Sequence, residues 1–137
     1  MKIEIHAVPI VKDGHKYLRI KSPVRVNHRV ADGTVFADVK AVWDTGATNT
    51  SIPMDVAVAM GIPLGEPSAV TRMKSTEPAR FCQFYLEFPD GTEIFVEEAL
   101  ALPKMKPQFI IGMDVIRKGV MTIEPDGQDG VYFTFTL

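Results

Sequence analysis

The residues AVWDTGATNTSIP, positions 41–53, end an apolar strand in a carboxylate. Asp44 therefore stands at the mouth of a strand that the pattern predicts to be buried. Gly46 and Ala47 are small enough for another backbone to approach closely, and Thr45 adds a hydroxyl group without bulk. Asp, Thr and Gly are also ordinary turn residues, so the tripeptide alone is equally typical of an Asx-turn or a helix N-cap.

A second apolar motif, FIIGMDVI at positions 109–116, follows about 65 residues after Asp44. It contains an apolar pair, then a glycine, then the start of a short helical pattern. Together, Asp-Thr-Gly-Ala after an apolar strand and apolar-apolar-Gly before a helix resemble the retropepsin-like aspartic protease family. The resemblance extends over residues 30–124, where residues 69–86 match the position of the family's flap hairpin.

The resemblance implies a role for each matching residue. Asp44 is then the catalytic aspartate. Thr45 and Gly46 complete the triplet: the threonine forms a hydrogen bond across the two-fold axis of the dimer, and the glycine backbone contacts substrate. The expected substrate-binding residues lie in the active-site loop, the flap tip and the second motif: Ala47, Thr48, Asn49, Met73, Lys74, Ser75, Thr76 and Ile110. The expected structural support comes from Ile111, Gly112 and Asp114.

Aspartic proteolysis needs two carboxylates that share one proton, and this chain contains one such triplet. The resemblance therefore implies a homodimer that joins Asp44 of each subunit and binds a peptide or protein substrate, with no metal or organic cofactor. Asp114 leaves an alternative open. It is either the second carboxylate of a dyad within one chain, or a first-turn residue that favours the helix dipole, which is the interpretation we prefer.

Outside the two motifs the chain is patterned as β-structure. Five Asp-Gly pairs separate short alternating or β-branched segments, as is typical of hairpins. Strands are predicted at residues 2–11, 16–21, 24–30, 34–43, 69–73, 80–88, 92–99, 108–111, 120–124 and 131–137, with short helices at 54–60 and 113–118. We expect an all-β closed barrel of the acid-protease type in one domain, residues 1–137, with residues 1–30 as an N-terminal extension or extra hairpin.

Composition excludes several other classes of protein. Apolar residues make up 46% and charged residues 23%, with a net charge of −2 and no basic run, so neither a nucleic-acid partner nor a membrane is expected. Residues 1–14 lack an export signal, which favours a cytoplasmic location. Cys82 can form no intramolecular disulfide and is expected to be a small buried apolar residue.

A protein with the same fold could also function without efficient catalysis. The expected flap, residues 70–80, has no glycine at its tip, and Thr48 and Asn49 lack the acidic side chain that viral members of the family place there. These departures favour a catalytically weak or silent dimer that binds extended peptides or acts as an assembly module.

Overall fold

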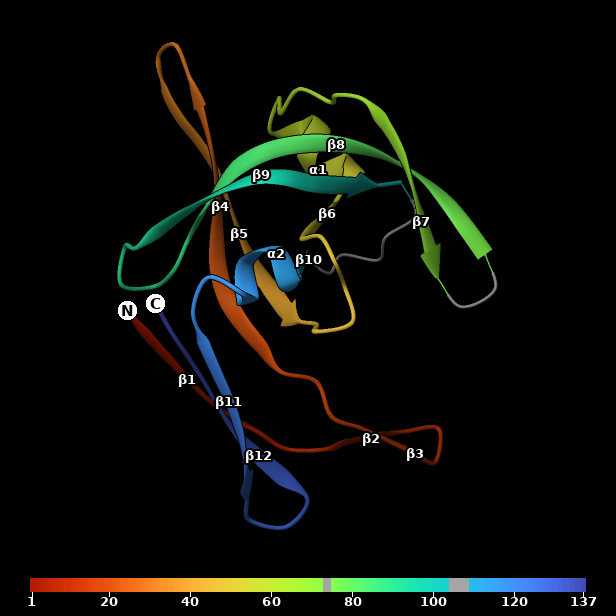
Figure 1. Cartoon of the computed structure of the whole chain (residues 1–137), viewed down its shortest axis with the longest axis vertical. Helices are drawn as coiled ribbons and strands as arrows, with labels where there is room; N and C mark the ends of the chain where they lie inside the picture. Colours follow the sequence, from red (N-terminus) through yellow and green to blue (C-terminus); the bar gives the residue numbers. More distant parts are fainter. Residues whose placement is uncertain (73–74, 104–108) are drawn as a thin grey trace.

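The computed structural model describes residues 1–72, 75–103 and 109–137 and is mostly β-structure (Figure 1). The strands are β1 (Lys2–Ala7), β2 (Ile10–Lys12), β3 (His15–Tyr17), β4 (Lys21–Val30), β5 (Gly33–Trp43), β6 (Ser51–Pro53), β7 (Pro67–Arg72), β8 (Ser75–Glu87), β9 (Glu93–Leu102), β10 (Phe109–Ile111), β11 (Val120–Asp126) and β12 (Gly130–Thr136). The helices are α1 (Met54–Ala59) and α2 (Met113–Ile116). The all-β prediction with two short helices is confirmed.

The largest sheet closes on itself. Its order is β4-β5-β10-β6-β9-β8-β7, and an additional pairing between β4 and β8 completes a ring that leaves β7 outside. The closed barrel expected from the sequence is therefore present. The ring encloses fully buried side chains from strands on opposite sides: Val26, Ile52, Phe84, Leu86, Phe109 and Ile111.

Two smaller sheets are built from the ends of the chain. In the order β1-β12-β11, the first strand of the chain pairs with the last along its whole length, from Lys2 opposite Thr136 to Ala7 opposite Val131. This terminal sheet lies below the barrel in Figure 1, and its Phe133 and Phe135 belong to the main core. β2 and β3 form a separate hairpin.

Asp-Gly pairs stand at the hairpin turns, as the sequence predicts. Asp13 and Gly14 join β2 to β3 with φ angles of 52° and 75°, and a type I′ turn requires positive φ at both central residues. The other pairs fall between β4 and β5, between β8 and β9, and between β11 and β12.

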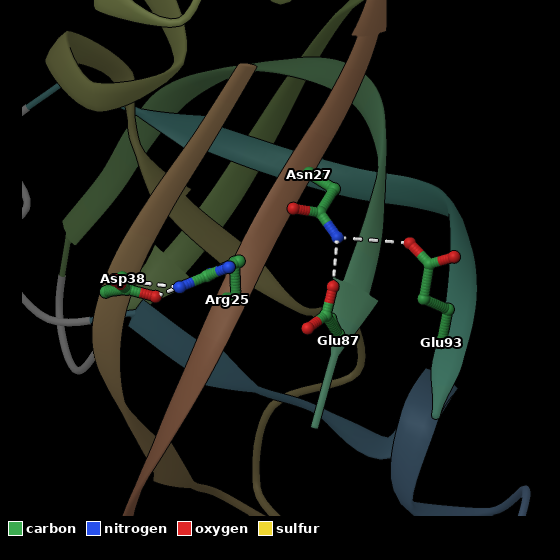
Figure 2. Close-up of polar contacts among 5 residues, drawn as sticks. All are labelled: Arg25, Asn27, Asp38, Glu87 and Glu93. Atoms are coloured by element: carbon green, nitrogen blue, oxygen red, sulfur yellow. Dashed lines mark hydrogen bonds and ion pairs between the residues drawn. The ribbon is translucent and has the colours of Figure 1, made fainter. Parts of the chain in front are cut away.

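The barrel closes through a short seam. β4 and β8 pair over only three positions, Arg25–Asn27 opposite Glu87–Tyr85. Asn27, buried within this seam, donates from Nδ2 to Glu87 at 2.8 Å and to Glu93 at 3.1 Å, and so ties three strands together (Figure 2). Also on β4, Arg25 Nε donates to Oδ1 of Asp38, on the neighbouring strand β5, at 2.8 Å (Figure 2).

Several predicted strand boundaries are wrong. The predicted strand at 2–11 breaks at Val8 and Pro9, so its end belongs to the β2–β3 hairpin. β8 begins at Ser75 rather than at residue 80, although it contains Pro78. Among the described residues this part of β8 pairs with β7 and with no other strand, because pairing with β9 begins at Arg80, and an edge of that kind tolerates proline.

Candidate active site

The loop that carries Asp44 spans two strands that are not neighbours. It leaves β5 and enters β6, and β10 lies between them, parallel to β5 and antiparallel to β6. The backbone N–H of Asp44 donates to the carbonyl of Ile111 in β10 at 3.0 Å. Asp44 Oδ1 then accepts the N–H of Gly46 at 2.8 Å, which closes an Asx-turn around the carboxylate.

The second motif, residues 109–116, is hydrogen-bonded to the Asp44 loop. The N–H groups that open α2 donate to loop carbonyls, from Met113 to Ala47 at 2.7 Å and from Asp114 to Thr48 at 3.2 Å. A Cβ atom at Gly112 would lie 2.6 Å from the backbone carbon of Asn49. Only glycine therefore allows the two motifs to approach so closely, which agrees with the supporting position expected for Gly112.

A buried hydroxyl links the loop to α2. Thr50 is 0% exposed, and its Oγ1 donates to Asp114 Oδ1 at 2.7 Å and accepts the N–H of Gly112 at 3.2 Å. Asp114 also accepts the backbone N–H of Thr50 at 3.0 Å and that of Val115 at 2.9 Å. These contacts are those of a positioning group, as in the interpretation of Asp114 that we prefer. Thr50 is not singled out by the sequence, because its partners lie more than 60 positions away.

Trp43, directly before Asp44, is buried and packs into the core. Its ring packs against Phe133 and Phe135 of the terminal sheet, with centroids 5.1 and 4.8 Å apart, and its Nε1 donates to Ser22 Oγ at 2.8 Å. The bulky residue before the carboxylate therefore anchors the end of β5 between the barrel and the terminal sheet.

An open cleft of about 1060 Å³ lies over the Asp44 loop. Asp44 is half-buried within its lining, whereas the side chain of Thr45 is exposed beside it. Of the residues expected to bind substrate or support the site, those in the cleft wall are Gly46, Ala47, Thr48, Asn49 and Ile110. Ser68 and Ala69 of β7 also line the cleft, so the β7–β8 hairpin, which contains the residues expected to form the flap, borders it.

The expected substrate-binding residues of the flap tip are Met73, Lys74, Ser75 and Thr76. Met73 and Lys74 lie outside the residues that the structure describes. Ser75 and Thr76 open β8, where their backbones pair with Arg72 and Thr71.

The cleft also contains residues that the sequence does not single out. Leu18, Arg19 and Ile20 line its lower wall together with Ile123 of β11. No motif marks them, because the first three lie in the segment between β3 and β4, where the carbonyl of Ile20 accepts the N–H of Trp43 at 2.9 Å, and Ile123 is far along the chain from Asp44.

Cys82 lies in the barrel wall rather than in the cleft. It is free and 4% exposed, and burial raises the pKa of its thiol to about 11. The expectation of a small buried apolar residue is confirmed. In the part of the chain that the structure describes, no three His, Cys, Asp or Glu side chains come together as metal ligands would. Neither of the helices described there has the length and apolar character needed to cross a membrane.

Known proteins were compared with this chain by sequence and by structure, and the structural comparison supports the fold described above. No protein-family model matches the sequence, and no curated protein matches it. Among solved structures, the chain is similar to the crystal structure of a retropepsin-like aspartic protease from Rickettsia conorii, with a TM-score of 0.58 and 18% sequence identity. The match covers 98% of this chain and 93% of the other. The chain therefore has the fold of the retropepsin-like aspartic proteases.

Proposed function

We propose that this protein is an aspartic endopeptidase whose active form is a homodimer with Asp44 of each subunit at the two-fold axis. The observation that carries the proposal is the Asp44-Thr45-Gly46 loop, clamped by β10 and α2 at the floor of an open cleft in a retropepsin-like fold. Ser68 and Ala69 of β7 line the same cleft, and in this proposal an extended substrate lies between the Asp44 loop and the β7–β8 hairpin.

The chemistry requires two carboxylates with unequal roles. One Asp44 carboxylate is ionised and removes a proton from water, and the other is protonated and donates to the carbonyl oxygen of the scissile peptide bond. In dyads of this kind the two carboxylates share one proton, because two like charges side by side do not both form easily. Activity should therefore be favoured at mildly acidic pH.

The second carboxylate is expected from another copy of the chain. Within one chain, the alternative second carboxylate in the sequence motifs is Asp114. Its oxygens accept hydrogen bonds from Thr50 and Val115, so this carboxylate holds the loop in position. The exposed hydroxyl of Thr45, beside the cleft, is available to contact the corresponding loop of a second subunit.

A second candidate function is a dimer that binds extended peptides in the same cleft without cutting them. It is favoured by Thr48 and Asn49, which give the cleft wall a hydroxyl and an amide where an acidic side chain would hold the substrate backbone. The Asn49 amide is already engaged, because its Nδ2 donates to the carbonyl of Glu98 at 2.8 Å.

The test is cleavage of a peptide library between about pH 3.5 and 7, a range that straddles carboxyl pKa values. Wild type, Asp44→Asn and Asp114→Asn are followed by mass spectrometry. We expect cleavage by the wild type that disappears in Asp44→Asn. Cleavage that survives in Asp44→Asn would refute the aspartyl mechanism. Binding of library peptides without cleavage would favour the second function, and equal loss in both variants of a monomer would point to a dyad within one chain.

A further inference from the structure

The β2–β3 hairpin carries exposed apolar side chains that nothing in the described chain covers. In residues 8–18, here called the arm, five large apolar side chains are 42–71% exposed: Val8, Ile10, Val11, Tyr17 and Leu18. The hairpin projects from the rest of the molecule (Figure 1). A lone two-stranded hairpin is marginally stable in water, and clustered exposed apolar side chains of this kind mark interaction surfaces.

The apolar side chains occupy both faces of the hairpin. Ile10 lies directly opposite Tyr17, whereas Val11 lies opposite Lys16 and points to the other face. Lys16 Nζ pairs with Asp129 Oδ2 at 2.9 Å and so links its face to the turn between β11 and β12. Among the residues that the structure describes, no ion pair links the Ile10–Tyr17 face to the rest of the chain.

The C-terminal end of the arm lies at the rim of the cleft that holds Asp44. Leu18 ends the arm and lines that cleft, together with Ile20 and with Ile123 of β11, which is itself 51% exposed. The proposed active site is incomplete in one chain, because each chain supplies one Asp44. A second copy must therefore approach the same rim from which the arm projects.

We propose that the arm packs its apolar side chains against a second copy of this chain, so that each subunit of the dimer is held by the arm of the other. This inference rests on the proposed function, which requires the second copy at the Asp44 cleft. A stable interface buries about 800 Å² on each partner, more than two short active-site loops can supply, and the arm provides additional apolar surface.

The test compares two double variants that are matched in exposure. Ile10→Ser with Tyr17→Ser removes side chains that are 59% and 45% exposed on the arm. The control, Val58→Ser with Phe95→Ser, removes side chains that are 60% and 42% exposed on α1 and β9, outside the Asp44 cleft. Sedimentation equilibrium gives the dimer dissociation constant of each, and circular dichroism and thermal unfolding establish that the monomer is folded.

We expect the dissociation constant to rise at least tenfold in the arm variant and by less than about threefold in the control. Two-fold symmetry places every substitution in the interface twice, and each 1.4 kcal/mol corresponds to about a factor of ten. A second arm variant, Val8→Ser with Val11→Ser, should weaken the dimer in the same direction. It replaces the first if that variant does not fold.

The outcomes separate this inference from the proposed function. If the wild type is dimeric and cleaves peptides while both arm variants dimerise like the control, the arm inference is wrong and the proposed function stands. A wild type that is monomeric and inactive would refute both. Arm variants that remain dimeric and lose cleavage only of a folded protein substrate would make the arm a substrate-docking element and would also overturn the inference.

Discussion

Replacing Thr50 with valine should loosen the Asp44 loop without opening a cavity. The two side chains have similar size, but valine loses the hydrogen bond to the Asp114 carboxylate and leaves the buried N–H of Gly112 unpaired. A hydrogen bond to a charged group contributes about 1.5–3 kcal/mol, and an unpaired buried donor costs about 1–3 kcal/mol. Because both effects arise from one hydroxyl and Asp114 keeps two backbone donors, we expect the free energy of unfolding to fall by about 2–4 kcal/mol.

Urea denaturation at a fixed protein concentration measures this loss, with an unchanged m-value as the sign that only stability has changed. Thr48→Val is the matched control for stability, because Thr48 lies in the same loop with an exposed side chain and should change the free energy by less than about 0.5 kcal/mol. If Thr50→Val unfolds within that margin of the wild type, the Thr50 hydroxyl does not hold the loop and the reasoning from the buried contacts is wrong.

Three further predictions concern packing, reactivity and pH. Gly112→Ala should lower kcat/KM for peptide cleavage at least tenfold and reduce the free energy of unfolding by about 1–3 kcal/mol, because the new Cβ would lie 2.6 Å from the backbone of Asn49. The thiol of Cys82, with its pKa raised by burial to about 11, should stay unreactive toward a disulfide reagent at pH 8 until urea unfolds the chain; prompt reaction in the folded state would contradict its burial. Arg25 lowers the pKa of Asp38 by hydrogen bonding, so stability from this pair is present above the unfolded carboxyl pKa of about 3.9 and is lost as pH falls through the lowered folded value. Urea denaturation of wild type and Asp38→Asn should therefore differ at pH 6 and converge at the acid end, and a constant difference would contradict this assignment.

Local patterns predict the hairpins of this protein well. The Asp-Gly pairs mark turns because glycine and aspartate accept positive φ angles, and Asp13 and Gly14 both adopt them. Strand ends that depend on distant neighbours are predicted poorly. β8 begins five residues earlier than its pattern indicates, since pairing with β7 offsets the presence of Pro78.

The candidate site likewise contains residues that local motifs predict and residues that they do not. Asp44 and Gly112 can be found from their own motifs, and the structure brings those motifs together through backbone hydrogen bonds. Thr50 and Leu18 cannot, because an ordinary threonine and an ordinary leucine acquire their positions only through contacts with residues far along the chain. The catalytic and substrate-binding roles themselves stay predictions.

The insertion of β10 between β5 and β6 has a consequence for the order of folding. The Asp44 loop spans a gap that Phe109–Ile111 fills, so a chain that lacks β10 cannot assemble it. Contacts of such long sequence separation form late, after the entropy of closing a large loop has been overcome. An incomplete or partly unfolded chain would therefore lack an organised Asp44 loop, and the timing of any proteolytic activity would be set by the topology of the barrel.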